Sequence, residues 1–500
     1  MKVLIDTNIF ISREQSKEVP ENLAALESIL KKNNVGIWVH PASINEIKIY
    51  GNIEARDIAL SKIKAYPVLG NPPDFNQDSE FTSKFNISKE KSLTDNLLLY
   101  AVLRNAVDFL ITEDGGVRGK AMVLDIRDRV LSVNEALNTI LALFEEPKIR
   151  KPPMLESKYV YELSKDDPIF DTLREEYSPG FDDWFDRICK DHRRCWVSYT
   201  PDGKLGAVAI YKDEDEEVKI APWPLPKKKR LKLATFKVVD NGYKIGELLI
   251  KISVRYCVEK NLDEIYLTHF VKPDDGLVQL ISEYGFYNVG KKGNGEDVFL
   301  KRLVKNDSTD ATPLEICKLY YPSFYDGTAV KKYVIPIMPA YHDKLFTDYP
   351  SRQTSLVEHL GGFITEGNTI KKAYLTQSKI KKLNPGDILL FYKSQHDRGL
   401  TAIGIIEQVT LRLNNRDEVL KHIGRRTVYS AREIDELLKK GPVTVILFIF
   451  NCYFKNMIPR ARLEELGIIA APPQTIGGIT DDKYVKVKEV GEVNGRYTIN

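Results

Sequence analysis

Apolar and polar positions alternate along this chain in a way that divides it into three blocks. In the first block, short apolar runs such as residues 3–5 and 109–111 alternate with segments of helical spacing. Strands that alternate with helices usually pair in parallel. This block therefore predicts an α/β domain built on a parallel sheet.

The middle block has a mixed pattern. It starts with helical spacing, and strands are predicted at residues 205–211, 231–239 and 265–268. A helix is predicted from Gly246, because apolar residues on either side of it follow helical spacing. The combination predicts a mixed α+β domain.

The last block is rich in strands. They are predicted at residues 333–337, 388–392, 402–409 and 443–450, and the turn Asn384-Pro385-Gly386-Asp387 precedes the second of them. We expect a small β-barrel with helices around it.

Two polar segments that contain proline separate the blocks, at residues 145–153 and 305–313. A chain of 500 residues is also too long for a single core. We therefore expect three domains, at residues 1–146, 153–304 and 328–495.

Composition says little about the cellular compartment and the partners of the protein. The hydrophobic share of 43% is ordinary for a globular protein, and the net charge of +3 neither requires nor excludes a nucleic-acid partner. The 5 cysteines are scattered and form no Cys-x-x-Cys motif, which favours a reducing, cytoplasmic compartment. We find no signal peptide and no apolar run long enough to span a bilayer, so no membrane association is expected. The oligomeric state is not indicated.

Four carboxylates lie near the ends of predicted elements in the first block; they are Asp6, Glu46, Asp95 and Asp114. Asp6 and Asp114 each follow a strand, so in a parallel sheet both emerge at the edge where open α/β sheets bind ligands. Hard oxygen ligands gathered at one point suit Mg²⁺ or Mn²⁺. The pattern predicts a divalent metal site made by these side chains.

Each carboxylate also has a structural explanation when it is taken alone. Ser43-x-x-Glu46 and Ser92-x-x-Asp95 match a helix capping box, and Asp114 is followed by glycine, a common turn pair. The grouping of all four in one α/β block favours the metal site over four unrelated caps.

The order of these motifs resembles that of the PIN domain family of metal-dependent ribonucleases. The matching segments are Leu4-Ile5-Asp6-Thr7-Asn8, Ser43-Ile44-Asn45-Glu46, Thr94-Asp95 and Leu110-Ile111-Thr112-Glu113-Asp114. The resemblance covers about residues 1–145. It implies that the four carboxylates hold Mg²⁺ or Mn²⁺, supported by Asn8 and Thr112. The metal would activate water and stabilise charge on the scissile phosphate.

A turn that contains glycine joins a strand to a helix in the middle block. After the strand at 231–239 the chain reads Asp240-Asn241-Gly242-Tyr243-Lys244-Ile245-Gly246-Glu247. Such a turn exposes backbone N–H groups at the helix N-terminus, which can hold a pyrophosphate. An ordinary strand–helix turn would show the same pattern.

The middle block resembles the GNAT family of acetyl-CoA-dependent acetyltransferases over about residues 153–303. The matching features are the strand entry at 204–208, the strand at 231–239, this turn, the strand at 265–268 and Glu283-Tyr284-Gly285-Phe286. The resemblance implies that acetyl-CoA binds against the turn. The residues that would hold its pyrophosphate are Gly242, Tyr243, Lys244, Ile245, Gly246 and Glu247.

Two positions depart from the GNAT pattern. Lys244 stands where the turn usually has its first glycine, and Ile281 stands where the family often has a tyrosine that acts as general acid. Tyr284 and Tyr287 are neighbours of that position rather than matches. The resemblance therefore implies acetyl-CoA binding and leaves the acid for the transfer step unassigned.

The last block resembles the PUA-like superfamily, which includes ASCH and EVE domains, over about residues 328–495. The turn at 384–387 and the strand that follows it carry the resemblance, whereas the charged signature of ASCH domains is not intact. Such domains bind RNA or modified bases. Basic and aromatic residues that suit phosphate contact and base stacking are Lys371, Lys372, Lys379, Lys381, Lys382, Tyr392, Lys393, Arg425 and Arg426.

Together the resemblances imply a cytoplasmic protein that acts on RNA, with tRNA as one candidate. It would join a metal-dependent endoribonuclease, an acetyl-CoA-dependent N-acetyltransferase and an RNA-binding barrel. Two alternatives stay open. One is an N-acetyltransferase of proteins or small molecules with non-catalytic flanking domains, and the other is a regulatory RNA-binding protein with inactive sites.

Overall fold

The computed structural model describes residues 1–9, 21–49, 51–85, 90–144, 155–200, 202–239, 244–305, 310–349, 369–395, 398–426 and 428–500. Contacts divide the chain into two compact units. The first comprises Met1–Lys148, Pro273–Gly276 and Thr410–Val445, and the second comprises Ile149–Lys272, Leu277–Val409 and Ile446–Asn500. The unit boundaries therefore differ from the block boundaries of the sequence.

The first unit is built on a four-stranded sheet with strand order β2-β1-β3-β4, and its described pairs are all parallel. Its elements from the first block are β1 (Lys2–Ile5), α2 (Glu21–Lys32), β2 (Gly36–Trp38), α3 (Pro41–Lys48), α4 (Ile53–Ile63), α5 (Ser79–Lys84), α6 (Glu90–Leu103), β3 (Phe109–Ile111), α7 (Gly115–Val123), η1 (Arg127–Arg129), β4 (Val130–Leu131) and α8 (Val133–Phe144). Strands β3 and β4 are wholly buried and apolar, as parallel strands covered on both faces must be. The predicted parallel α/β sheet is confirmed.

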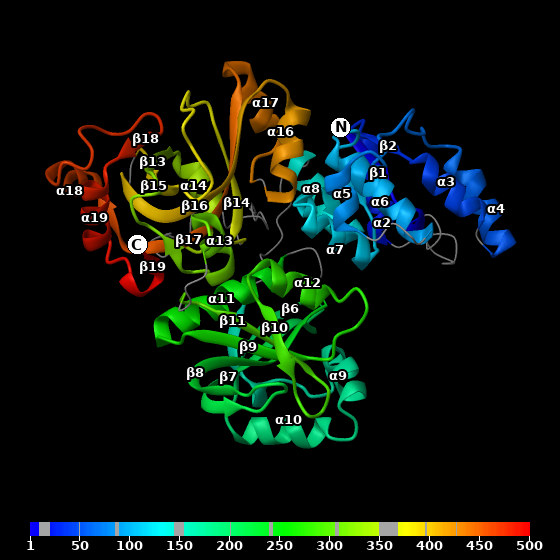
Figure 1. The fold of residues 1–500 in the computed structure, drawn as a ribbon, viewed down its shortest axis with the longest axis horizontal. Helices are drawn as coiled ribbons and strands as arrows, with labels where there is room; N and C mark the ends of the chain where they lie inside the picture. Colours follow the sequence, from blue (N-terminus) through cyan, green and yellow to red (C-terminus); the bar gives the residue numbers. More distant parts are fainter. Residues whose placement is uncertain are drawn as a thin grey trace. The chain divides into compact units, whose positions relative to one another are not determined.

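Part of the last block also belongs to the first unit. Helices α16 (Arg416–Ile423), η5 (Gly424–Arg426) and α17 (Ala431–Lys440) lie beside α8 in Figure 1. Arg425 donates from Nε to Asp128 Oδ1 at 3.0 Å and also pairs with Glu135, while Arg426 pairs with Asp128. These two arginines, predicted to contact RNA, are instead committed to ion pairs inside the first unit.

The second unit contains a seven-stranded sheet with order β10-β11-β9-β8-β7-β6-β5, in which only the β8–β9 pair is parallel among the pairs described. Its elements are β5 (Glu156–Tyr159), η2 (Val160–Glu162), η3 (Pro168–Phe170), α9 (Asp171–Glu176), α10 (Phe181–Lys190), β6 (Arg194–Tyr199), β7 (Leu205–Val218), β8 (Leu225–Val238), α11 (Ile245–Lys260), β9 (Glu264–His269), α12 (Gly276–Glu283), β10 (Tyr287–Lys291) and β11 (Asp297–Arg302). The predicted mixed sheet is present.

Strands β7 and β8 are longer than the sequence pattern predicts. The acidic run 213–217 and the basic run 227–230 are strand residues on neighbouring strands. Asp215 is opposite Lys229 and Glu216 is opposite Lys228. Opposite charges across an antiparallel pair stabilise the extension, so charge complementarity takes the place of apolar alternation.

The last block forms a six-stranded sheet with order β14-β17-β16-β15-β13-β18 and a small two-stranded pair, β12–β19. Its elements are α13 (Pro313–Tyr320), β12 (Phe324–Tyr325), β13 (Lys332–Ile337), α14 (Pro339–Leu345), β14 (Lys371–Thr376), β15 (Ile388–Lys393), β16 (Gly399–Leu413), β17 (Val443–Pro459), α18 (Arg460–Glu465), β18 (Gly477–Ile479), α19 (Asp481–Val490), η6 (Gly495–Tyr497) and β19 (Thr498–Ile499).

This six-stranded sheet is curled but not closed. In the described part of the chain, no pairing joins β14 to β13 or β18, so the predicted barrel is not formed as a closed ring. The two edges nevertheless approach each other, because the Tyr374 hydroxyl on β14 donates to the Pro336 carbonyl on β13 at 2.7 Å.

One hydrophobic core serves both the middle and the last block. Tyr284, Phe286 and Leu303 from the middle block belong to the same buried cluster as Phe324 and Tyr497 from the last block. The Ser323 hydroxyl also donates to the Leu303 carbonyl at 2.5 Å. The polar segment 305–313 therefore joins two halves of one core and does not separate two independent ones.

Lys301 on β11 makes the stability of this core depend on pH. Its side chain is fully buried, its Nζ donates to the Leu319 carbonyl at 3.3 Å, and burial lowers its pKa to about 7. Between pH 7 and the ordinary value of 10.5 the unfolded chain binds a proton that the folded protein lacks. The contribution of Lys301 to the free energy of unfolding therefore rises with pH in that window, by about 1.4 kcal/mol per unit.

We expect Lys301→Met to raise the melting temperature most at neutral pH, with a gain that shrinks as the pH rises toward 10.5. Thermal melts of both proteins across this range measure the effect. Lys219→Met, at an exposed lysine, is the control and should shift little at any pH. A gain that grows with pH would contradict the assignment of a neutral buried amine.

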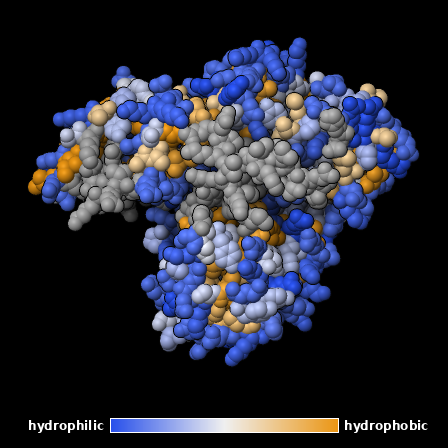
Figure 2. All heavy atoms as spheres, turned by 180° about the vertical axis from the view of Figure 1, so that it is seen from behind, coloured by the Kyte–Doolittle hydropathy of each residue, from blue (hydrophilic) through white to orange (hydrophobic). Residues whose placement is uncertain are grey.

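Hydrophilic residues predominate on the face of the molecule seen in Figure 2, and hydrophobic patches there are small and scattered. In the part of the chain that the structure describes, no helix combines the length and apolar character needed to cross a bilayer.

Candidate functional site

The carboxylates at the edge of the parallel sheet interact with one another. Asp6 is 5% exposed, and Thr112, from the end of β3, donates to its Oδ2 at 2.5 Å. The pKa of Asp6 is raised to about 7. Burial is the main cause and the charges of Asp95 and Glu46 add to it, while the hydrogen bond from Thr112 lowers the pKa. Asp95 and Glu46 are therefore near enough to Asp6 to act on its pKa, and the convergence of all four carboxylates on one cation stays a prediction.

The helix-cap explanation is wrong for Glu46 and Asp95. Helix α3 begins at Pro41 with His40 as its N-cap, and the His40 Nδ1 accepts from the Ala42 amide at 3.1 Å. Glu46 lies near the end of that helix and accepts from the Thr7 hydroxyl at 2.9 Å. Asp95 lies well inside α6, which begins at Glu90.

Asp114 does act as a cap, because its Oδ1 accepts from the amides of Gly116 and Val117 at the start of α7. Asp95 also forms an ion pair with Lys120, whose Nζ lies 3.2 Å from Asp95 Oδ2. Among the described residues no group of three or more His, Cys, Asp or Glu side chains is arranged to hold a metal ion. The predicted Mg²⁺ or Mn²⁺ site is therefore unsupported, although Thr112 supports Asp6 as predicted, and Asn8 reaches Thr112 at 3.2 Å.

Removal of the buried charge at Asp6 should stabilise the protein if this cluster holds no cation. We expect Asp6→Asn to raise the free energy of unfolding by about 1 kcal/mol or more, since each unit of pKa displacement corresponds to about 1.4 kcal/mol. Denaturant unfolding measures it, with Glu54→Gln on the exposed side of α4 as a control. Stabilisation of the native protein by Mn²⁺ that Asp6→Asn abolishes would instead restore the metal site.

The seven-stranded sheet splits between its two parallel strands. Pairing of β8 with β9 ends at Leu233 opposite Leu267. Ala234 is an extra residue in β8, since Tyr211 pairs with Leu233 and Ile210 pairs with Thr235. Such a bulge bends and twists its strand. Beyond it, β8 stays paired with β7 and β9 with β11, and the strand pairs described there include none between β8 and β9.

Helix α11 follows the end of β8 at which the two strands separate. Its first residues belong to the site predicted for a pyrophosphate. Gly242 and Tyr243 lie outside the described residues. Lys244 is the N-cap with φ of 51°, in the left-handed region where a glycine would be less strained. A lysine at this position therefore has a backbone cost.

The other predicted residues of this turn direct their side chains inward. Ile245 is in the core, and a Cβ on Gly246 would lie 2.5 Å from Leu280 Cδ2, so this glycine permits close packing of α11 on α12. Glu247 Oε1 accepts from the backbone amide of Ile370 at 2.6 Å. What Ile245, Gly246 and Glu247 can offer to an anion is therefore backbone N–H groups rather than side chains.

A polar group that the sequence did not single out lies where the sheet splits. Glu296 is 4% exposed, and its Oε1 accepts from the Tyr177 hydroxyl and, at 2.9 Å, from the Thr268 hydroxyl. Its Oε2 accepts from Asn294 at 2.8 Å. Burial works to raise the pKa of Glu296, but the hydrogen bonds from Tyr177, Asn294 and Thr268 hold it below its ordinary value.

Tyr177 follows α9, and its ring packs on Phe270 just beyond β9, with centroids 5.5 Å apart. Burial and the bond to Glu296 raise the pKa of Tyr177 well above its ordinary value, so the hydroxyl keeps its proton. Tyr284, considered from the sequence as a neighbour of the acid position, is buried in the core. The two partners Tyr177 and Glu296 are 119 residues apart, and no local motif announces their meeting.

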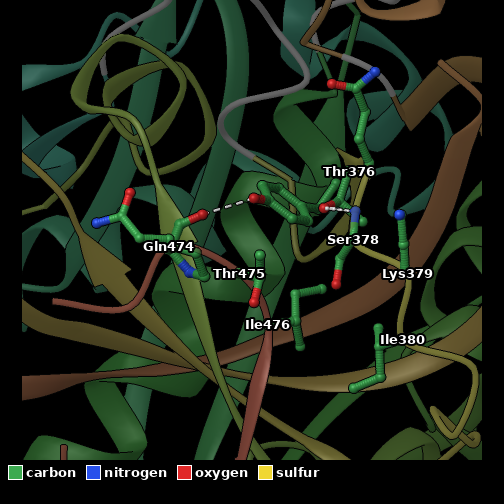
Figure 3. A pocket seen from close by; sticks show the side chains of 10 residues that line it. Thr376, Ser378, Lys379, Ile380, Gln474, Thr475 and Ile476 are labelled. Carbon is green, nitrogen blue, oxygen red and sulfur yellow. Dashed lines mark hydrogen bonds between the residues drawn. The ribbon is translucent and has the colours of Figure 1, made fainter. Parts of the chain in front are cut away.

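A cavity of about 510 Å³ lies between the two edges of the curled sheet. Figure 3 shows Gln474 and Lys379 on opposite sides of it, with Thr475 and Ile476 between them. Tyr374, whose hydroxyl bonds to Pro336, is part of the lining. The cavity offers an aromatic ring, amides, hydroxyls and one cation to a ligand of moderate size.

The residues predicted for RNA contact differ in their exposure. Lys372 and Tyr392 are buried, so they cannot touch an external nucleic acid. Lys379, Lys381 and Lys382 are exposed, and Lys379 lines the cavity.

No protein-family model matches the sequence, and no curated protein matches it. Parts of the chain are similar to solved structures. An ASCH protein from Zymomonas mobilis shares 12% identity over 32% of this chain and 95% of its own, with a TM-score of 0.25. A GNAT-family acetyltransferase from Listeria monocytogenes shares 19% identity over 30% of this chain and 95% of its own, with a TM-score of 0.22. A GNAT-family acetyltransferase from Staphylococcus aureus shares 17% identity over 30% of this chain and 99% of its own, also with a TM-score of 0.22.

None of the structures named above supports the PIN resemblance of the first block or a ribonuclease activity. The chain is an α/β protein with a four-stranded parallel sheet, two larger mixed sheets and a small parallel pair, and the solved ASCH and GNAT structures each align with about a third of it.

Proposed function

We propose that the second unit is an acetyl-CoA-dependent acetyltransferase of primary amines. The observation that carries the proposal is the split between β8 and β9, with the start of α11 at one side and the Tyr177–Glu296 pair at the other. An extended ligand with amide groups can bond to open strand edges, and helix N-terminal amides favour phosphate. The acyl-linked arm of acetyl-CoA has the first feature and its pyrophosphate has the second.

Acetyl-CoA supplies a thioester whose carbonyl carbon an amine can attack. The Glu296 carboxylate draws in the protonated amine by charge and accepts its proton. Tyr177 holds a proton that it can pass to the departing sulfur and recover from Glu296 along their hydrogen bond. In the balanced step the ammonium gives up two protons, one to the solvent before attack and one through Glu296 and Tyr177 to the sulfur, while a C–N bond forms and a C–S bond breaks. Positioning of the two reactants supplies much of the remaining acceleration.

Calorimetric titration with acetyl-CoA tests the proposal at its first step. We expect binding with a single site per chain, competed by CoA. Absence of heat and of competition would overturn it. The outcome does not depend on knowledge of the amine acceptor.

We further propose that the cavity between the sheet edges takes a nucleotide of single-stranded RNA. The support is its size, the ring of Tyr374, the amide of Gln474 and the exposed cations Lys379, Lys381 and Lys382. Stacking and amide bonds suit a base, and lysines suit the phosphates on either side of it.

Lys379→Ala should weaken binding of a single-stranded oligouridine and reduce the slope of log affinity against log salt by about one, because one phosphate contact is lost. Fluorescence anisotropy across a salt series measures both. Lys440→Ala, at an exposed lysine on α17, is the matched control. Equal affinity and slope for the two variants would show that RNA does not use this cavity.

Metal-dependent cleavage of RNA by the first unit stays a prediction. It is supported only by the approach of Asp6, Glu46 and Asp95 to one another, and the Mn²⁺ arm of the Asp6→Asn measurement tests it.

A further inference from the structure

The tip of the β7–β8 hairpin carries a tryptophan that is open to solvent. Trp223 is 79% exposed, the largest fraction among the large hydrophobic side chains of the described residues. Tryptophan is highly buried on average in folded proteins, so an indole left in water is an unusual feature of a surface. Pro222 and Pro224 flank it and fix their own φ angles, which limits the conformations of the tip. The indole is therefore available to a ligand, and its surroundings decide which one.

The tip is fixed to the edge strand β10. The Ala221 amide donates to the Lys291 carbonyl at 2.9 Å, and the Lys291 amide donates to the Ala221 carbonyl at 3.1 Å. Gly290, with φ of 143°, permits this approach, because a Cβ there would lie 2.1 Å from the Ala221 oxygen. Trp223 is two residues away from this bridge. Its backbone is therefore held in place before a ligand binds, and little freedom remains to be lost on binding.

The hairpin packs on the face of the sheet to which the Glu296 carboxylate points. Ile220 belongs to the same buried cluster as Tyr266 on β9. Thr268 lies two residues further along β9, and side chains two residues apart on a regular strand share one face. The Thr268 hydroxyl donates to Glu296 Oε1 at 2.9 Å. The hairpin and the proposed acceptor carboxylate are therefore on one side of the seven-stranded sheet.

The turn that carries Glu296 starts where the tip is attached to β10. Lys291 pairs with Ala221, and the amide of the next residue, Lys292, donates to the Glu296 carbonyl at 2.8 Å. The tip and the acceptor carboxylate are thus connected by two consecutive backbone contacts. A long ligand whose amine meets Glu296 can extend over the hairpin tip.

Cations outnumber carboxylates around the tip. Lys219, Lys227 and Lys229 are exposed, and in the part of the chain that the structure describes none of them forms an ion pair. Glu217 is the single carboxylate of the segment 217–229. Lys219 and Lys227 are each four residues from Trp223, so their backbones lie within about 14 Å of it. The charge around the indole therefore favours an anionic ligand and disfavours a polycation.

We propose that the hairpin tip, residues 219–227, binds single-stranded RNA that carries the acceptor amine. An unpaired base stacks on Trp223, and phosphates beside it contact Lys219 and Lys227. Every base has a face that an indole can cover, and each phosphate carries the charge that a lysine complements, so RNA matches both features of the tip. A membrane surface or an acidic protein matches the lysines but offers no ring to stack on the indole.

This inference rests on the proposed acetyl transfer and names its substrate class, an RNA strand with a primary amine. The transfer step keeps its balance. A C–N bond forms on the amine of the strand and the C–S bond of the thioester breaks. Of the two protons that the ammonium loses, one goes to the solvent and one passes through Glu296 and Tyr177 to the sulfur.

Titration of the full chain with a single-stranded oligouridine, followed by tryptophan fluorescence, tests the stacking contact. We expect quenching that saturates, because a base stacked on an indole quenches its emission. Trp223→Leu should abolish the quenching and weaken binding about tenfold, as measured by anisotropy of labelled oligouridine. Trp184→Phe, at a half-buried tryptophan of α10, is the matched control and should keep both quenching and affinity.

The lysines are tested in the same titration across a salt series. Lys219→Ala and Lys227→Ala should each raise the oligouridine concentration at half-quenching and reduce the slope of log affinity against log salt by about one. Lys190→Ala, at an exposed lysine of α10, should change neither. Absence of quenching in the native protein, or equal quenching in Trp223→Leu, would overturn the RNA contact. Quenching by anionic vesicles or by polyglutamate that equals the effect of oligouridine would overturn the assignment to RNA.

An oligouridine with an alkyl amine at its 3′ end tests the acceptor role. We expect its KM to be lower than that of spermine, and Trp223→Leu should raise its KM about tenfold relative to the KM of spermine. Equal KM ratios in the native protein and the variant would overturn the acceptor role of the hairpin tip. Quenching by oligouridine without any binding of acetyl-CoA would overturn the proposed function while the RNA contact stands.

Discussion

A protein truncated after Lys305 is expected not to fold its middle sheet. Tyr284, Phe286 and Leu303 are buried in a cluster whose other side is supplied by residues of the last block. Each large apolar side chain left open to water costs about 1.5–3 kcal/mol, so several together exceed the usual stability of a domain. The expected result is an insoluble or unfolded fragment, measured by solubility and by near-ultraviolet circular dichroism against the full chain.

Point variants in the full chain separate the shared core from other effects of truncation. Phe324→Ala, on the last-block side of the cluster, should lower the free energy of unfolding by about 3–5 kcal/mol. Leu319→Ala, at a side chain 48% exposed, is the control and should have a small effect. A fragment of the middle block that unfolds cooperatively at the temperature of the full chain would show that its core is complete alone.

The second large effect is expected on catalysis. Tyr177→Phe and Glu296→Gln should each lower kcat for acetyl transfer by about a hundredfold or more, the usual contribution of positioned acid–base groups. Neither should change the affinity for acetyl-CoA much, because both lie where the amine and the sulfur are expected rather than at the phosphates. Release of CoA with polylysine and with spermine as acceptor probes measures the rate.

Two exposed residues give controls for this pair. Tyr161→Phe removes a hydroxyl from a tyrosine 52% exposed and stacked on Tyr159, and Glu217→Gln removes a charge from the exposed end of β7. Both should keep full activity. Loss of kcat in Glu296→Gln with Tyr177→Phe unchanged would remove the acid role from Tyr177. Unchanged activity in both variants would place the chemistry elsewhere.

The sequence by itself determined much of the local structure of the protein. Apolar runs located β1 and β3, because parallel strands are buried on both faces and need no polar alternation. Glycine and helical spacing located the start of α11, and the ends of strands located Asp6 and Thr112 at one sheet edge. These features depend on neighbours within a few residues, which the sequence displays directly.

Only the tertiary structure decided which charges are buried, paired or free. Arg425 and Lys372 look like surface cations, but the first pairs with Asp128, 297 positions earlier, and the second is fully buried. The meeting of Tyr177 with Glu296 has the same origin. Such contacts are set by strand order and by packing of distant segments onto one core, and no local pattern encodes them. The sequence therefore predicted many of the strands and helices and the sheet edge at which Asp6 lies. The candidate transfer site and the shared core became visible only in three dimensions.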